Sequence, residues 1–202
     1  STAAAVGFQW LVNSLRSFFK SDLFEFKRQV EPFTDNDYNF AGRPPLQVDM
    51  LLKSDSGDIE LTIINIHMKC CDSGLQRRKN AVKMLHDYVD KNFNSQPNII
   101  LLGDWNDDTK DAPGQHSFDY FFNDDRFYFV TEQISYDLSQ ASYPKEPWVS
   151  FLDHILVSKN LVPYESNYNV QTIKMGDYMG GYDNYETYIS DHLPVLLSFP
   201  KP

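Results

Sequence analysis

The stretch at residues 99–108, IILLGDWNDD, combines a strand pattern with a cluster of polar side chains. Its apolar, β-favouring beginning predicts a short buried strand over Asn98–Leu102. That strand ends abruptly at Gly103-Asp104, and polar side chains follow at once. Rigid strands commonly hold functional groups on the loops at their ends. An Asp in this position more often caps a turn, so the stretch has to be weighed together with the rest of the chain.

Segments on either side of this stretch alternate between strand and helix patterns. Leu46–Leu52 and Ile59–Ile66 predict consecutive strands joined by a turn. A helix is expected from about Leu75 to Phe93, because Val82 and Val89 fall on one apolar stripe. This order predicts an α/β or α+β layered sandwich. Further strands are expected at Phe127–Gln133, Phe151–Val157, Val170–Lys174 and Leu193–Phe199.

Two segments have a less regular pattern. Residues 8–19 are compatible with a helix or with a strand that carries an insertion. Gly176–Tyr188 is expected to be a polar, aromatic loop. Its tyrosines could stack on a base or a sugar, or could pin the loop to the protein.

Polar clusters also stand at the ends of other predicted strands. His67 closes the strand that begins at Ile59, Asp153 opens a later strand, and Asp191-His192 precedes the last one. A lone His or Asp is usually structural, but four such clusters are hard to assign to turns alone. Converging carboxylates bind hard cations, and histidines can face phosphate oxygens. His154 should point to the opposite face of its strand from Asp153.

The composition is that of one soluble-type domain of 202 residues with a formal net charge of −10. This acidic balance argues against a protein that coats nucleic acid, which would carry a basic stripe. It does not exclude a nuclease, because a bound divalent cation brings positive charge to the phosphate. No apolar run approaches the roughly 20 residues that span a bilayer. The composition leaves the cellular compartment open.

The cysteines, Cys70 and Cys71, are adjacent in the sequence. A bridge between neighbours is strained, so a disulfide scaffold is not expected. A thiolate metal site would need further cysteines, which the chain does not have. Two reduced thiols on a loop are the expectation.

Several motifs together resemble the endonuclease/exonuclease/phosphatase superfamily. They are ILLGDWND at residues 100–107, LDHILVS at 152–158, SDHLPV at 190–195 and NIHMK at 65–69. Arg43-Pro44-Pro45 before a strand is also similar to a segment of that superfamily. The resemblance runs from about Gly42 to Phe199. The group includes deoxyribonuclease-I-like nucleases, abasic-site endonucleases, neutral sphingomyelinases and inositol phosphatases.

This resemblance implies a single domain over residues 1–202, folded as a four-layered α/β sandwich with two mostly antiparallel sheets packed between helices. It also implies Mg²⁺ or Mn²⁺ as cofactor. Asp104 would orient or deprotonate the attacking water and contact the metal, and Asn106 would hold a phosphate oxygen or that water. Asp191 would lie beside the metal.

The same resemblance assigns the remaining roles. His192 would face the scissile phosphate, Asp153 would fix its tautomer, and His67 would contact the phosphate from the opposite side. Arg43 and Tyr182 are candidates for substrate binding. Of the nearby cations, Arg78 is of interest because it lies on the inward stripe of the predicted helix. Trp105 is expected to pack beneath its turn.

The resemblance fails upstream of Arg43. The superfamily opens with a strand that carries an Asn, followed by a metal-binding Glu. Asn13, Glu25 and Glu31 do not stand in the matching context. We therefore expect a chain that lacks the N-terminal portion of the domain, with weak activity alone. Its exposed sheet edges would favour a partner chain or strand exchange.

Three functions remain open at this stage. The leading expectation is a phosphodiester hydrolase acting on DNA or RNA. The second is a phosphatase or phospholipase acting on inositol phosphates or sphingomyelin. The third is a non-catalytic binding domain that keeps part of a site.

Overall fold

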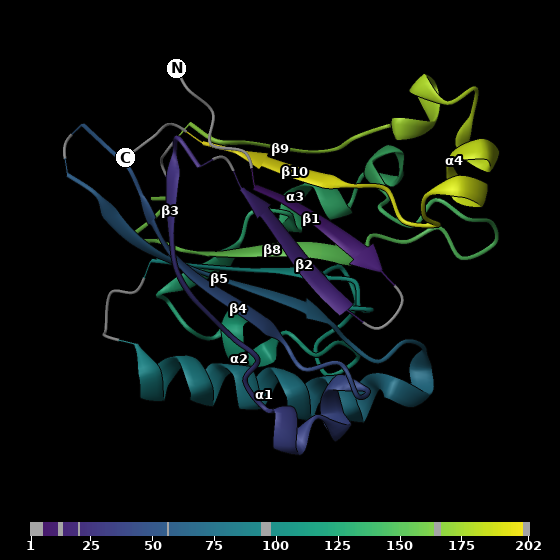
Figure 1. Ribbon diagram of the computed structural model, residues 1–202. Helices are drawn as coiled ribbons and strands as arrows, with labels where there is room; N and C mark the ends of the chain where they lie inside the picture. Colours follow the sequence, from purple (N-terminus) through teal and green to yellow (C-terminus); the bar gives the residue numbers. More distant parts are fainter. Residues whose placement is uncertain are drawn as a thin grey trace.

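The computed structural model describes residues 6–11, 14–19, 21–55, 57–93, 98–163 and 167–199. Figure 1 shows the arrangement of the elements. The strands are β1 (Val6–Leu11), β2 (Ser14–Phe19), β3 (Phe24–Val30), β4 (Leu46–Leu52), β5 (Ile59–His67), β6 (Ile99–Asp104), β7 (Phe127–Phe129), β8 (Asp153–Ser158), β9 (Asn169–Thr172) and β10 (Val195–Ser198). The α-helices are α1 (Leu75–Asn92), α2 (Asp119–Phe122), α3 (Glu132–Ser135) and α4 (Tyr182–Tyr188).

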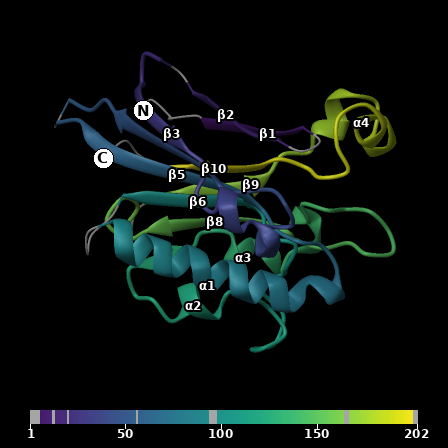
Figure 2. The same cartoon turned by 60° about the horizontal axis from the view of Figure 1, so that its bottom comes forward.

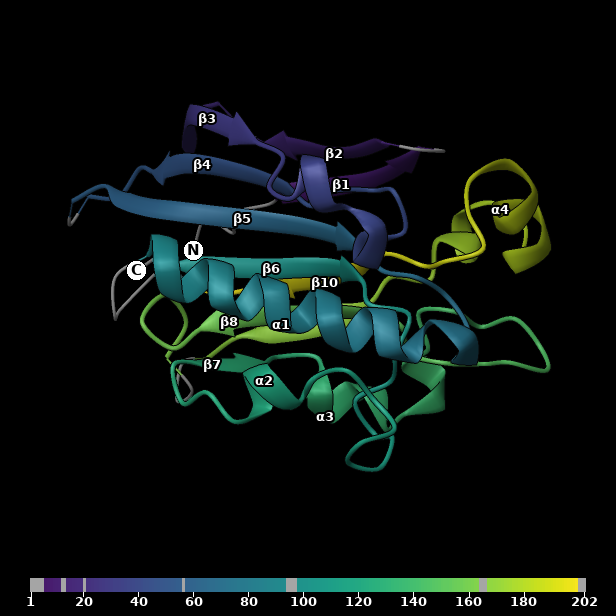
Figure 3. The same ribbon diagram turned by 90° about the horizontal axis from the view of Figure 1, so that it is seen from below.

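A mixed six-stranded sheet in the order β3-β4-β5-β6-β8-β7 forms the centre of the molecule. β5 and β6 are parallel, and the other neighbours are antiparallel. A parallel pair needs a long crossover connection, and α1 provides it (Figure 3). The strands expected over Leu46–Leu52 and Ile59–Ile66 are confirmed, as is the helix that follows them.

The apolar stripe of α1 covers one face of this sheet. Its buried residues include Ala81, Val82, Leu85 and Val89, spaced as one face of a helix requires. They pack in a single cluster with alternate residues of β5 and β6. Fully burying an aliphatic side chain contributes about 1.5–3 kcal/mol, so this interface is a main source of stability.

The opposite face of the sheet is covered by a second β layer. It consists of two separate antiparallel ladders, β9–β10 and β1–β2. Val195 and Leu197 of β10 pack against a buried cluster that includes Ile63 and Ile155 of the central sheet. Figure 2 shows α1 and α2 on one side of the central sheet and both ladders on the other. The α/β sandwich expected from the sequence is confirmed.

Two sequence expectations need correction downstream. The strand expected over Phe127–Gln133 ends at Phe129, and the chain turns into α3. Thr131 explains the change, because its Oγ1 accepts a hydrogen bond from the backbone N–H of Ile155 at 3.2 Å. A side chain thereby takes over the bonding that a continuing strand would provide.

The other correction concerns Gly176–Tyr188, which was expected to be a loop but contains α4. Tyr178 and Tyr188 are exposed there, whereas Tyr185 is buried. The ambiguous residues 8–19 fall within the β1–β2 ladder and the two undescribed residues between its strands. Among the described helices, none is both long enough and apolar enough to cross a bilayer.

Candidate active site

Strand register brings three predicted site residues into one row. His67 of β5 lies opposite Asp104 of β6, and Asp104 lies opposite Asp153 of β8. Residues in register project from the same face of a sheet. The row stands at the end of the sheet where β5 and β6 finish, on the side of α4 in Figure 1.

Gly103 makes this close arrangement possible. It has φ +130°, a conformation that L side chains rarely adopt, and a Cβ atom there would lie 2.1 Å from the carbonyl oxygen of Ile66. Any larger residue would push β6 away from β5. The Gly-Asp pair of the motif therefore sets the distance between Asp104 and His67.

Asp104 is buried, with 4% of its surface exposed. Its Oδ1 accepts from the backbone N–H of Asn106 at 2.8 Å, and its Oδ2 accepts from Asn106 Nδ2 at 2.7 Å. Asn106 can make both bonds because it adopts φ +51°, which Asn tolerates. Burial, followed by the nearby charge of Asp153, raises the pKa of Asp104 to about 7.

Asp153 and His192 form a short ion pair beside Asp104. His192 Nδ1 donates to Asp153 Oδ2 at 2.6 Å. Burial opposes the charge on His192, but the charge of Asp153 and this hydrogen bond outweigh burial and raise the pKa of His192 to about 10. Burial also disfavours ionised Asp153, yet the charge and hydrogen bond of His192 lower its pKa. At neutral pH, His192 is therefore protonated and Asp153 ionised.

Asp104 lies beside the Asp153–His192 pair. Oxygen or nitrogen atoms of Asp104, Asp153 and His192 all lie within 4.8 Å of one another. His67 Nε2 lies 3.3 Å from Asp104 Oδ2 on the other side. Burial, followed by the charges of Arg43 and His192, lowers the pKa of His67 to about 4, so its imidazole is neutral at pH 7.

Arg43 brings an unsatisfied donor close to Asp104. Its Nη2 donates to the carbonyl of Met68 at 2.9 Å. Its buried Nε has no hydrogen-bond partner in the described part of the chain. Orphaned buried donors are rare in proteins, and this one lies close enough for the charge of Asp104 to act on it. A phosphate oxygen would satisfy it.

Helix α4 holds the segment that carries His192. The Tyr182 hydroxyl donates to the carbonyl of Asp191 at 2.6 Å, and the Tyr185 hydroxyl donates to the carbonyl of His192 at 3.1 Å. The hydroxyl of Tyr182 is thus engaged, which leaves its ring for any contact with substrate. Asp191 is exposed, and in the described residues its carboxylate is not part of the Asp104–Asp153–His192 group.

His154 lies on the other face, as predicted, and Trp105 packs beneath its turn, also as expected. Trp105 is fully buried against Phe118 and Phe129, and its Nε1 donates to the carbonyl of His154 at 3.1 Å. His154 is also fully buried, with Nδ1 3.1 Å from Thr131 Oγ1. Both residues are structural.

Two residues that support the site from behind, Asp107 and Ser142, were not identified as such from the sequence, whereas Arg78 was expected to point inward. Arg78 is buried and binds Asp107 through two hydrogen bonds of 3.0 and 3.1 Å, so it does not face the pocket. Ser142 Oγ accepts from the backbone N–H of Asp153 at 3.0 Å. Asp107 belonged to the quoted motif, whereas no local pattern marks Ser142.

The structure gives no support for a metal role of the upstream acidic residues. Glu25 lies on β3 and pairs with Lys27 at 2.5 Å on the surface. Glu31 is exposed just after β3. Asn13 lies outside the described residues.

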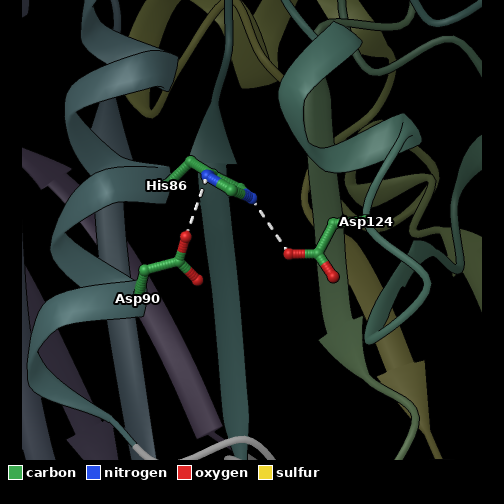
Figure 4. Close-up of side chains that lie close together, drawn as sticks. All are labelled: His86, Asp90 and Asp124. Atoms are coloured by element: carbon green, nitrogen blue, oxygen red, sulfur yellow. Dashed lines mark hydrogen bonds and ion pairs between the residues drawn. The ribbon is translucent and has the colours of Figure 1, made fainter.

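A second His/Asp group joins α1 to the segment before β7 (Figure 4). His86 Nε2 lies 2.9 Å from Asp124, and Nδ1 lies 3.6 Å from Asp90. Arg126 binds both carboxylates. The guanidinium already supplies the positive charge that a metal would bring, so we assign this group a structural role.

The sequence matches no protein-family model and none of the curated proteins. Solved structures are similar in fold. The catalytic domain of human Nocturnin with a bound sulfate anion aligns with a TM-score of 0.56 and 17% identity, over 91% of this chain and 62% of that chain. D. rerio TDP2 complexed with a single strand DNA product aligns with a TM-score of 0.60 and 14% identity, over 98% of this chain and 77% of that chain.

A protein described as endonuclease/exonuclease/phosphatase from Beutenbergia cavernae aligns with a TM-score of 0.53 and 14% identity, over 88% of this chain and 45% of that chain. The chain thus spans less than two thirds of the Nocturnin and B. cavernae chains. At these identities the likeness establishes the fold. It confirms the fold that the motifs implied.

Proposed function

We propose that this chain, which has the endonuclease/exonuclease/phosphatase fold, is a metal-dependent hydrolase of phosphodiester bonds with nucleic acid as its substrate. The observation that carries the proposal is the convergence of His67, Asp104 and Asp153 with a protonated His192. The structural neighbours add support, since D. rerio TDP2 is complexed with a single strand DNA product and the Nocturnin catalytic domain holds a bound sulfate anion. Sulfate has the tetrahedral, anionic shape of phosphate.

The charges in the pocket suit an attack on phosphate. Negative charge grows on the phosphate oxygens in the transition state, and preorganised donors stabilise it. His192 is protonated and held by Asp153, and the Nε of Arg43 is a donor without a partner among the described residues. Asp104, with a pKa of about 7, suits proton removal from water near neutral pH. Asn106 and neutral His67 flank it.

The residues present fit a hard divalent cation. Asp104 offers buried carboxylate oxygens, and burial, followed by the charge of Asp153, raises its pKa to about 7, so a cation beside its ionised form would be favourable. The charge of Asp153 is compensated by His192, which as an imidazolium is no ligand. We assign Mg²⁺ or Mn²⁺ to Asp104, while the exposed carboxylate of Asp191, expected beside the metal, lies outside the Asp104–Asp153–His192 group. The ion would supply Lewis-acid stabilisation of charge on the phosphate.

The test measures plasmid nicking and hydrolysis of bis(p-nitrophenyl) phosphate with Mg²⁺ or Mn²⁺ and with EDTA. Asp104→Asn and His192→Gln should each remove most of the activity, and Asp87→Asn, an exposed change on α1, should not. EDTA should abolish hydrolysis, and added metal should restore it. Tight binding of DNA without any cleavage would instead identify a non-catalytic binding domain.

One observation favours a second candidate, a phospholipase. An apolar cavity of about 610 Å³ lies between the central sheet and β9–β10, and Asp153 and His192 are part of its lining. Leu102, Ile155 and Leu197 contribute to its apolar wall. Such a cavity would accept the hydrocarbon part of a lipid phosphodiester. Release of phosphocholine from sphingomyelin, with plasmid left intact, would favour this candidate over the nuclease.

A further inference from the structure

The loop that follows His67 holds two thiols in contact. Cys71 Sγ lies 2.9 Å from Cys70 Sγ, and Lys69 Nζ lies 3.4 Å from Cys70 Sγ. Cys70 is half-buried and Cys71 is exposed, so reagents in solution reach the pair. Both are free cysteines, as the sequence predicted.

We propose that Cys70 and Cys71 form a reversible dithiol switch, which a hydroperoxide closes into a disulfide and which lowers the activity of the neighbouring site. The loss of activity rests on the proposed hydrolase function. The closure of the disulfide does not.

The two thiols have different roles. The hydrogen bond from Cys71 lowers the pKa of the Cys70 thiol, and Lys69 and Arg43 add to this against the effect of burial. The thiolate is the reactive form of cysteine. Oxidant-sensing cysteines are typically accessible, of low pKa and next to a resolving thiol. Cys70 is therefore the attacking residue, and Cys71 resolves.

The chemistry balances with one hydroperoxide. The Cys70 thiolate attacks the O–O bond, a sulfur–oxygen bond forms, and the leaving oxygen takes a proton and departs as water or alcohol. The Cys71 sulfur then attacks Cys70 sulfur. The sulfur–sulfur bond forms, and the sulfenic oxygen leaves as water with the proton from Cys71. Two thiols are oxidised and one peroxide is reduced.

The backbone favours a labile product. Cys71 has φ 70° and ψ 167°, a region occupied almost solely by glycine. Consecutive Cα atoms stand about 3.8 Å apart, closer than the roughly 4.4–6.8 Å that disulfides usually join. Strained, exposed disulfides are the readily reduced, regulatory ones. A thiol reductant should therefore reopen the pair.

The same loop is bonded to the site. The Met68 carbonyl accepts from Arg43 Nη2 at 2.9 Å and from Asn106 Nδ2 at 3.2 Å. The Lys69 and Cys71 carbonyls accept from Arg78 Nη1 at 2.9 and 2.8 Å. A change in the backbone at Cys70-Cys71 therefore moves acceptors that hold Arg43 and Asn106 in place.

The experiment treats the whole chain with hydrogen peroxide and measures the mass of the peptide that contains both cysteines, together with hydrolysis of bis(p-nitrophenyl) phosphate. The mass should fall by two hydrogen atoms, and activity should fall about tenfold to hundredfold, the usual effect of a small misplacement of reacting groups. Dithiothreitol should restore both. The Cys70→Ser, Cys71→Ser double variant should keep its activity in peroxide.

Three results would overturn the proposal. These are separate sulfinic acids on the two cysteines, disulfides between chains, and an equal loss of activity in the double variant. The wild-type chain could also form the disulfide without hydrolysing any substrate before peroxide is added. That result would contradict the proposed hydrolase function, whereas the peptide mass would still establish the dithiol chemistry.

Discussion

Replacing Asp153 by Asn should release the proton of His192. The pKa of His192 rises from an ordinary 6.5 to about 10 in the folded chain, with Asp153 as the main stabilising partner. At about 1.4 kcal/mol for each pKa unit, this corresponds to about 5 kcal/mol in favour of the protonated form. In Asp153→Asn, burial remains and most of the compensation is lost, so the pKa should fall to 6.5 or below.

The stability of the two proteins should then diverge in a defined pH range. Because the folded pKa is raised, the contribution of His192 is complete below about pH 6.5 and is lost as the pH rises through about 10. At pH 7 it amounts to about 4 kcal/mol, and by pH 10 to about 1 kcal/mol or less. The difference in unfolding free energy between wild type and Asp153→Asn should therefore become smaller as the pH rises from 7 to 10.

The assay is an NMR titration of the histidine ring protons without metal, combined with urea unfolding at pH 6, 8 and 10. His192→Gln assigns the resonance by its disappearance. Asp87→Asn removes an exposed carboxylate that pairs with Lys83, and it should cost only about 0–1 kcal/mol. A wild-type His192 that titrates near pH 6.5 would refute the reasoning, whatever the variant does.

Other predictions follow from the same structure. Gly103→Ala should cost more than about 3 kcal/mol in unfolding free energy, since backbone strain alone costs about 1–3 kcal/mol and the new Cβ also meets Ile66. Gly114→Ala, with open space around it, should cost about 1–2 kcal/mol, and equal losses would contradict this. Arg78→Met should cost about 3–5 kcal/mol because it leaves Asp107 buried and unpaired, and a change below about 1 kcal/mol would disprove a structural ion pair. Mg²⁺ should raise the melting temperature more at pH 8 than at pH 5, since the cation replaces the proton that Asp104 holds below about pH 7, and an equal rise at both would argue against Asp104 as ligand.

The sequence was informative wherever local pattern and tertiary structure agree. In Leu46–Leu52 every second residue is apolar and buried, and the structure assigns the strand the expected bounds. The stripe of α1 is equally clear. The sequence predictions were wrong in two kinds of place. One is where a long-range hydrogen bond ends a strand, as at Thr131, and the other is where a helix is short and polar, as at Tyr182–Tyr188. Neither feature produces a periodic pattern of apolar residues in the sequence.

The structure brings together several of the residues that the sequence named for the candidate site, though not Asp191, and their protonation was not predictable. His67, Asp104 and Asp153 were candidates because they stand at the ends of predicted strands. Only the strand register shows that they lie in one row across the sheet. Their charges depend on neighbours from distant segments. Burial and positive charges leave His67 neutral, whereas Asp153 keeps His192 protonated. Two histidines of one site therefore have opposite charge states, which no sequence pattern distinguishes.

The quoted motif shows why a few adjacent residues can be recognised without revealing their separate roles. Asp104 lies between His67 and the Asp153–His192 pair, and Trp105 fills the core on the helical side. Asn106 turns back through a left-handed conformation to bind Asp104. Asp107 reaches α1 and holds Arg78, which in turn binds the cysteine loop. Each of these side chains contacts a different part of the protein. A substitution at one position should therefore disturb mainly the contacts of that one side chain. Only Asp104 and Asn106 should change the chemistry directly, and the rest should act through stability or position.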